Sequence, residues 1–275
     1  MTGGPVRWRS AARAHAAGMG QRIRVVAALT LLGLVAAGCG GDDSTTSTAG
    51  GGGTTTTAAP VIDPGDGGHY APNIDPANFV TAIDNPYMPL APGARWVFDG
   101  TGDDGEAEHN VVAVTDQHKD VMGIPVVVVR DTVSVQGETT EDTYDWYAQD
   151  RDGNVWYMGE DSKEYENGQV TSTEGSWEGG VDGALPGIVM QAHPAVGQAY
   201  RQEYYKGSAE DMAQVAQVGT TKAIAQGQYS DVVVIKEWSP LEPEVVEQKY
   251  YAPGIGVIAE ETLSGGHETA ELTGT

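Results

Sequence analysis

Hydrophobic and polar residues alternate most clearly between Glu141 and Asp161, in the sequence EDTYDWYAQDRDGNVWYMGED. A period of two places successive side chains on opposite faces of a β-strand. The dipeptide Asp152-Gly153 interrupts the alternation and tolerates the positive φ angles of a type I′ turn. The pattern therefore predicts a central β-hairpin with aromatic rings on both faces of its sheet, and we expect other segments to cover both faces.

Similar short runs, separated by turn residues, fill the rest of the chain after residue 90. Asn167-Gly168 predicts a second hairpin turn. Residues 209–218 fit either a helix or a strand, and we favour the strand. Residues 179–197 are rich in Gly and Pro, which predicts a crossing loop with a helical turn at 187–191. The other predicted strands are 95–99, 108–115, 121–135, 163–165, 169–176, 200–205, 232–238, 245–251, 255–261 and an edge strand at 267–272.

These elements predict an all-β fold, because strands recur without long helices and without β-α-β alternation. Most connections are short, which favours an antiparallel meander curled into a barrel or half-barrel. A Greek-key sandwich remains open, since periodicity alone does not separate the two. Before the first strand, four prolines between residues 69 and 90 indicate an irregular entry segment, with one helical turn near residues 75–82.

The N-terminus has the layout of a secretory signal peptide, which we place at residues 1–38. Arg22 and Arg24 precede an apolar run at 25–37, which is shorter than the roughly 20 residues that span a bilayer. The sequence LVAAGC that ends at Cys39 resembles the bacterial lipobox, although Ala36 stands where Leu is more usual.

This resemblance implies that Cys39 becomes the first mature residue and carries a diacylglycerol with fatty acyl chains such as palmitate. The expected location is therefore the extracytoplasmic face of the cell membrane, with the protein held there through the lipid on Cys39. Either Met1 or Met19 could start translation, because a start at Met19 leaves a more ordinary signal peptide.

Residues 39–68 follow the signal and consist mainly of Gly, Thr, Ser, Ala and Asp. Such a composition buries too little apolar surface to offset the entropy of ordering, so it predicts a flexible, disordered linker. The remaining residues, 69–275, form a single predicted β domain. Cys39 is the one cysteine of the chain, so no internal disulfide is expected.

Charge excludes one class of partner. All 39 acidic residues follow Gly38, together with only 10 of the 15 basic residues, a balance of −29. Nucleic acid would be repelled by such a surface, so it is not an expected partner. No cofactor motif is present in the sequence, and we expect no cofactor. A protein partner cannot be named from these features.

Four stretches of the domain resemble an uncharacterised family of exported bacterial proteins. They are DNPYMPL at residues 84–90, the hairpin at 143–159, GQYSDVVV at 227–234 and KYYAPGIGVI at 249–258. The resemblance implies a curved antiparallel sheet, similar in places to the half-barrels of lipoprotein carriers. It implies no catalytic residues.

Candidate chemistry other than binding is sparse. Asp150–Asn154 has the alternating acids and glycine of a calcium loop, but lacks the flanking helices and the final glutamate of an EF-hand, and a hairpin turn explains it without metal. His69, His109, His118, His193 and His267 are scattered, and Glu108-His109 is a weak metal candidate; we expect no metal site.

The common nucleophile and phosphate-binding motifs are absent from the sequence. Glu174 and Glu178 flank Trp177, as an acid pair in a hydrolase cleft would, which keeps an acid-pair hydrolase as a minor alternative. The interpretation favoured here is a protein that is not an enzyme.

Five aromatic residues provide the best lead to a binding site. They either belong to the core or form a pocket in the curved sheet, as in small barrels that hold one ligand. The predicted function is a binding protein for a small apolar or sugar-like ligand; the alternative is a structural or protein-interaction lipoprotein without a pocket. The five residues are Tyr144, Trp146, Trp156, Tyr157 and Trp177.

Overall fold

The computed structural model describes residues 62–275, so the predicted signal peptide, Cys39 and most of the linker lie outside the described residues. The described chain forms one antiparallel sheet of 16 strands and a single short 3₁₀ helix, η1 (Pro76–Asn78). The strands are β1 (Phe79–Val80), β2 (Arg95–Thr101), β3 (Ala107–Val121), β4 (Ile124–Val135), β5 (Glu138–Asp150), β6 (Val155–Glu166), β7 (Gln169–Ser172), β8 (Trp177–Glu178), β9 (Leu185–Met190), β10 (Ala199–Arg201), β11 (Glu203–Tyr204), β12 (Met212–Ile224), β13 (Gly227–Trp238), β14 (Val246–Ala252), β15 (Gly256–Ser264) and β16 (Thr269–Gly274).

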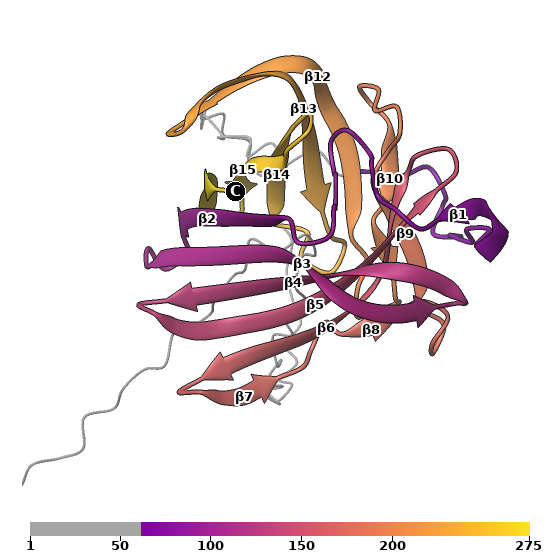
Figure 1. Ribbon diagram of the computed structural model, residues 1–275, viewed down its shortest axis with the longest axis horizontal. Coiled ribbons are helices and arrows are strands. Elements are labelled where there is room, and N and C mark those ends of the chain that lie inside the picture. The colour runs from indigo at the N-terminus through magenta and orange to yellow at the C-terminus, as the bar shows by residue number, and fades with distance from the viewer. Residues whose placement is uncertain (1–61) are drawn as a thin grey trace, which may run out of the picture.

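The strand order is β10-β12-β13-β14-β15-β16-β2-β3-β4-β5-β6-β9-β11, with β1 beside β5 and both β7 and β8 beside β6. Two meanders, β2 to β6 and β12 to β16, therefore form the two halves of the sheet, and β16 joins them by pairing with both β15 and β2. The sheet curls strongly between the two halves (Figure 1). The predicted all-β meander is confirmed, as a half-barrel whose sheet is not closed.

The first and last strands of this order, β10 and β11, are consecutive in the chain. β10 pairs with β12, β11 pairs with β9, and only Gln202 separates β10 from β11. Gly187 in β9 packs directly on the backbone of Arg201 and Gln202, where a Cβ atom would overlap both residues. The covalent chain thus forms a seam between the two halves, and glycine is the residue that lets β9 approach it.

Side chains on β5 show why the strands take this arrangement. Tyr147 lies on the concave face and packs in the main hydrophobic core, together with Tyr157 and Val129. Trp146 lies on the convex face in a second cluster, which Phe79 and Ile74 of the entry segment help to cover. The hairpin therefore has aromatic rings on both faces, and both faces are covered, as its alternation predicted.

The central hairpin is confirmed, but its turn is not of the predicted type. Strands β5 and β6 are joined by four residues, and only Gly153 among them has a positive φ, of 94°. Asp150 accounts for this loop, because its carboxylate accepts hydrogen bonds from the backbone N–H and side-chain amide of Asn154. The type I′ geometry appears instead at Asn167-Gly168, with φ values of 51° and 72°.

Other local predictions divide in the same way. The 3₁₀ turn η1 falls within the predicted helical turn, with Asp75 as its N-cap, and residues 212–224 form a strand as favoured. The helical turn predicted at 187–191 is wrong, because this Gly- and Pro-containing segment pairs as β9 with β6 and β11. The strand predicted at 267–272 is confirmed as β16, but its predicted edge position is wrong, because β16 pairs with both β15 and β2.

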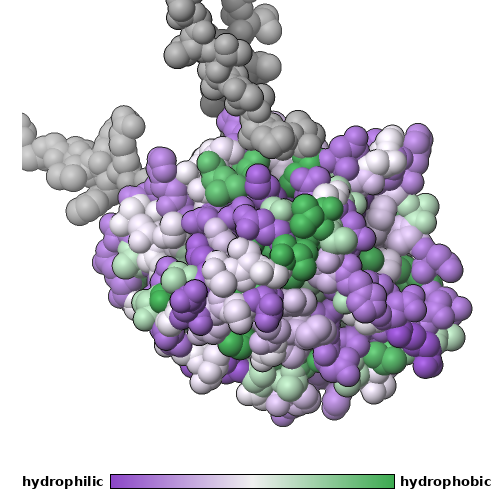
Figure 2. Space-filling model, turned by 90° about the horizontal axis from the view of Figure 1, so that it is seen from above, coloured by the Kyte–Doolittle hydropathy of each residue, from purple (hydrophilic) through white to green (hydrophobic). Residues whose placement is uncertain are grey.

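Packing onto the domain begins seven residues before the predicted boundary at residue 69. Ile62 is buried against Met212, Trp238 and Val246, near the end of the β12–β14 half. No helix within residues 62–275 is long and apolar enough to cross a bilayer. On the face shown in Figure 2, hydrophobic residues occur in small groups between hydrophilic ones, as expected for a strongly acidic surface.

Candidate functional site

The loop at residues 83–90 contains the DNPYMPL motif and closes one end of the half-barrel. Asn85 is buried and its side-chain amide donates hydrogen bonds to the carbonyl oxygens of Gly153, at 2.9 Å, and Gln191, at 3.2 Å. Gln149 Oε1 in turn accepts from the backbone N–H groups of Asp84 and Asn85, both at 2.9 Å. These bonds fasten the loop to the β5–β6 end of the sheet.

The same loop also reaches the other half of the sheet. The Tyr87 hydroxyl donates to the carbonyl oxygen of Asp231 in β13, at 3.2 Å. The Gly254 N–H, in the turn between β14 and β15, donates to the carbonyl oxygen of Pro86 at 2.6 Å. The segment that joins β1 to β2 thus crosses between the two halves of the molecule (Figure 1) and holds them together at this end.

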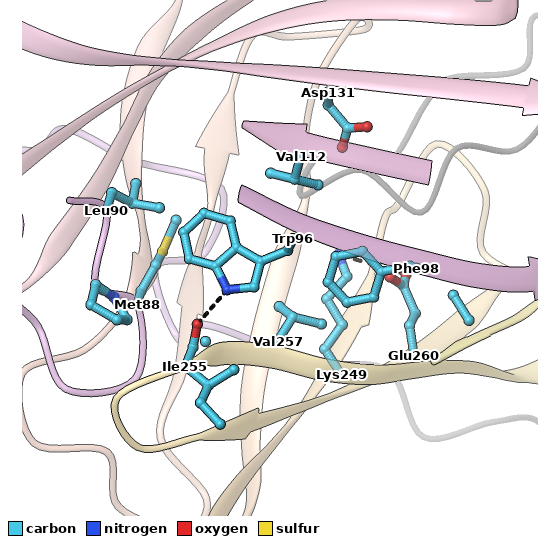
Figure 3. A pocket seen from close by; sticks show the side chains of 13 residues that line it. Met88, Leu90, Trp96, Phe98, Val112, Asp131, Lys249, Ile255, Val257 and Glu260 are labelled. Carbon is cyan, nitrogen blue, oxygen red and sulfur yellow. Dashed lines mark hydrogen bonds and ion pairs between the residues drawn. The ribbon is translucent and has the colours of Figure 1, made fainter. Parts of the chain in front are cut away.

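A narrow pocket lies beneath this loop, between β2 and β15 (Figure 3). Its volume is about 40 Å³. One water needs roughly 10–15 Å³ by this measure, so the pocket has room for a slim group of a few heavy atoms. The lining residues are mostly apolar: Met88, Pro89, Leu90, Trp96, Phe98, Val112, Asp131, Lys249, Ile255, Gly256, Val257, Glu260 and Ala270.

Trp96 fixes one wall of the pocket. Its indole N–H donates to the carbonyl oxygen of Ile255 at 2.8 Å, across the space between β2 and the turn before β15. The partly exposed lining residues at the mouth are Pro89, Ile255 and Val257, which are neighbours of the loop and turn, whereas the Glu260 side chain is only 11% exposed. The pocket therefore opens beside the 83–90 loop, with Trp96 behind its mouth.

Charged groups lie at the inner end, around Lys249, whose side chain is 3% exposed. The Lys249 ammonium is 2.5 Å from Glu237 Oε2 and 3.7 Å from Glu260 Oε1. Glu237 also accepts a hydrogen bond of 2.8 Å from the side-chain amide of Gln202, in the seam. On the opposite half, Asp131 accepts one of 2.8 Å from Asn110. The apolar pocket thus ends on buried polar groups that come from both halves of the sheet.

Burial governs the protonation of this network. It raises the pKa of Glu260 to about 8, although Lys249 acts to lower it. Burial likewise raises the pKa of Glu247 to about 7. The pKa of Lys249 lies well above its ordinary value, because the attraction of carboxylates, Glu237 first among them, exceeds the opposing effect of burial. At neutral pH Lys249 is charged, and Glu260 is largely protonated.

A second group of polar residues occupies the concave face further from the pocket. Glu203 is 1% exposed, and its Oε2 accepts from the Trp177 indole N–H at 2.8 Å. Burial raises the pKa of Glu203 well above its ordinary value. Tyr157 donates to Asp145 at 2.7 Å and stacks on Tyr147 at a centroid distance of 5.1 Å. These contacts are those of a packed polar core.

The five predicted ligand-binding aromatics do not come together around one cavity. Tyr157 and Trp177 lie on the concave face, where their rings meet edge to face at 5.5 Å. Tyr144, Trp146 and Trp156 belong to the cluster on the convex face. None of the five lines the pocket below the 83–90 loop, and their role in binding stays a prediction.

Two of the five line a shallow groove of about 280 Å³ on the convex face, with Gln117, His118, Lys119, Val128 and Asp161. The two are Tyr144 and Trp146, on β5. Lys119 lies over the Trp146 ring, with its ammonium 3.9 Å from the ring centroid, and pairs with Glu178 at 2.8 Å. Gln117, His118 and Lys119 follow or lie within a β-bulge between Val114 and His118 in β3, where the pairing with β4 shifts its register.

The calcium-loop candidate and the Glu108-His109 metal candidate contain residues that bond to neighbouring strands or to their own hairpin. Asp150 is engaged within its own hairpin and also accepts from the Trp156 indole N–H at 2.9 Å. His109 lies 2.7 Å from Asp99 on the exposed face of β2 and β3. Within residues 62–275, no three His, Cys, Asp or Glu side chains are arranged to hold a metal ion.

Sequence reasoning missed the residues that define the pocket. Lys249 follows Glu247 and precedes Tyr251 at the period of two, so alternation within VEQKYYA at residues 246–252 places all three on one face of β14. A lysine between two residues of a buried face was the available signal. Trp96 and Phe98 also lie at a spacing of two in RWVFD at residues 95–99, so alternation places both on one face of β2.

Comparisons with known proteins yield only distant structural neighbours. No family model matches the sequence, and no curated protein matches it significantly. A Bacteroides fragilis protein described as exported, with a YmcC-like fold, matches with a TM-score of 0.40 and 16% identity, over 68% of this chain and 96% of the other. A Parabacteroides distasonis protein described as a lipoprotein matches with a TM-score of 0.36 and 13% identity, over 68% and 97%.

Proposed function

We propose that this chain is a lipid-anchored, extracytoplasmic binding protein without catalytic activity, and that it holds a small, mainly apolar ligand. The observation that carries the proposal is the pocket below the 83–90 loop, whose walls are apolar and whose inner end is polar. Ligand sites typically combine apolar walls with a few placed polar groups. Hydrogen bonds to both halves of the sheet hold the loop over this site.

The location and the anchor in this proposal come from the sequence. The apolar run at 25–37, the lipobox-like sequence before Cys39 and the polar stretch after it support export followed by lipid attachment. Replacement of Cys39 by Ser would remove the acceptor sulfur. The expected result is that the protein leaves the membrane fraction of its host and appears unanchored; retention in the membrane fraction would contradict the lipid anchor.

Native mass spectrometry of the protein purified from its own host tests the ligand. The expected spectrum shows an additional mass that is lost on denaturation and is absent from a Val257→Trp variant, in which the larger side chain fills the mouth. A bare mass from the native host would contradict the binding function. It would favour the alternative of a structural or protein-interaction lipoprotein, and a protein partner would then be sought by crosslinking at the membrane surface.

A second candidate ligand, a sugar, is supported by the groove on the convex face. Tyr144 offers a partly exposed ring there, and Lys119, Gln117 and Asp161 supply polar groups around it. Saturation-transfer NMR with neutral oligosaccharides tests this candidate. Enhancements that disappear in Tyr144→Ala but persist in Val257→Trp would assign the sugar to the groove, whereas signals unaffected by Tyr144→Ala would exclude it.

A further inference from the structure

The inner end of the pocket contains more carboxyl groups than ammonium groups. Asp131 and Glu260 line it together with Lys249, and Glu237 pairs with Lys249 from the neighbouring strand. The Lys249 charge is already balanced by Glu237, 2.5 Å away. An anionic group in the pocket would therefore lie beside Asp131 without gaining a new cationic partner, and it would oppose ionisation of Glu260.

The whole domain adds to this local preference. The chain after Gly38 carries 39 acidic and 10 basic residues. A pocket with low-dielectric walls concentrates the field of such a surface and attracts cations from solution. The charges near the pocket and the charge of the whole domain thus both favour a positively charged ligand.

The pocket walls suit a slim chain with a cationic head. Trp96 and Phe98 present aromatic rings, which attract cations through their π-electrons, and Leu90 and Val257 provide aliphatic surface (Figure 3). The volume of about 40 Å³ suits a narrow group such as an unbranched chain.

We propose that this pocket selects unbranched aliphatic amines over carboxylic acids of the same length, so that the leading group of the ligand is a primary ammonium close to Asp131 and Glu260. This inference rests on the proposed binding function and specifies the chemistry of its ligand. It makes Asp131 and Glu260 the residues that determine specificity, while Lys249 holds Glu237 and Glu260 in place.

Amine binding has a second consequence at Glu260. Burial raises the pKa of this carboxyl to about 8, with further upward contributions from Glu247, Glu237 and Asp131 and a downward one from Lys249. A bound ammonium favours the ionised carboxylate and so lowers the pKa of Glu260. Binding at pH 7 should therefore release a proton, and the binding enthalpy should vary with the ionisation enthalpy of the buffer.

Isothermal titration calorimetry with hexylamine, hexanol and hexanoate tests the selectivity, because the three probes differ only in the head group. The full chain carrying Cys39→Ser is used at pH 7. Hexylamine should bind at least tenfold more tightly than hexanoate, with proton release. In Glu260→Gln, which keeps the shape of the side chain, that ratio should fall at least threefold and proton release should be lost.

Two further variants locate the binding. Val257→Trp should abolish the hexylamine signal by filling the mouth, whereas Val218→Trp, at an exposed position in β12, should leave it unchanged. Hexanoate binding that equals or exceeds hexylamine binding would overturn the amine inference alone. Hexylamine binding that survives Val257→Trp would overturn both the inference and the assignment of the pocket.

Discussion

Arg201 holds Asp66 in a two-pronged ion pair, with Nε donating to Oδ2 at 2.6 Å and Nη2 donating to Oδ1 at 3.2 Å. The guanidinium is buried, and the rings of Tyr70 and Tyr204, which contact each other edge to face, lie 5.8 and 4.6 Å from it. The pair joins the first described turn of the chain to the seam between the two halves of the sheet. The entry segment is therefore part of the folded domain.

Replacement of Asp66 by Asn should lower the free energy of unfolding by about 3 kcal/mol, because it leaves a buried guanidinium without its counter-charge. Chemical denaturation of this variant tests the expectation. Asp63→Asn is the matched control, since Asp63 is exposed and its carboxylate accepts a local hydrogen bond from the backbone N–H of Gly65. Equal stability of the two variants would contradict a structural role for the ion pair.

Stability should fall as pH rises from about 5 to 8. Burial raises the pKa of Glu260 to about 8 and that of Glu268 to about 10. At a pH above the ordinary pKa of a glutamate, the folded protein therefore keeps protons that the unfolded chain has released, and unfolding becomes easier as pH rises. One such carboxyl lowers the free energy of unfolding by on the order of 3 kcal/mol over this pH range. A change of 1 kcal/mol shifts Tm by about 2–4 °C in a domain of this size. We expect Tm to drop by about 5 °C or more.

Differential scanning calorimetry across this pH range measures the effect. Glu268→Gln should flatten the dependence, because the amide cannot ionise, whereas the exposed Glu174→Gln should not. At acidic pH the dependence has the opposite sign, and stability falls as pH falls. The hydrogen bonds from Arg201 hold the pKa of Asp66 below its ordinary value, so the stability that this ion pair contributes is lost as pH falls through the lowered pKa. A Tm that rises between pH 5 and 8 would contradict neutral buried carboxyls.

Asn85→Ala should loosen the loop at residues 83–90. The substitution removes the bonds to the carbonyl oxygens of Gly153 and Gln191 and leaves both without this donor, at a cost of about 1–3 kcal/mol. Hydrogen exchange should accelerate in the loop and in the adjoining turn at 253–255. Asn73→Ala, at an exposed position, is the control, and unchanged exchange in Asn85→Ala would show that the loop is held by other contacts.

Gly187→Ala should be among the most damaging single substitutions in the domain. The added methyl group would overlap the backbone of Gln202, so β9 could not stay beside the seam; a loss of about 4 kcal/mol or more is expected. Gly274→Ala is a fair comparison, because its Cβ would make an ordinary contact of 3.5 Å with Val97. Soluble yield and Tm measure both, and a normally stable Gly187→Ala would contradict the tight packing of the seam.

The sequence pattern was sufficient for elements that are set locally. Alternation in β5 and β6 and the Asn167-Gly168 turn depend on neighbouring residues only, and both were predicted. β9 was missed because its pairing depends on distant partners, and its glycine and proline disfavour a strand by themselves. The position of β16 was missed for the same reason, since its partner β2 lies about 170 residues earlier.

Site residues follow the same rule. Pattern reasoning selected the aromatic hairpin, yet alternation says only that Trp146 and Tyr147 face opposite ways, not which face carries a cavity. The pocket takes its residues from the 83–90 loop, β2 and β15, which are far apart in the chain. Curvature of the sheet brings them together, and that curvature is a property of the whole strand order.

The internal position of β16 bears on when the domain can fold. A ribosome makes β16 after every other described strand, yet this strand supplies the only ladder between the β2–β6 and β12–β15 meanders on that side of the sheet. Until residues 269–274 have emerged, Phe98 has no partner for its pairing with Leu272 and the pocket has no Ala270. Until then the seam and the 83–90 loop connect the two meanders, so the sheet can be completed only when the end of the described chain is present.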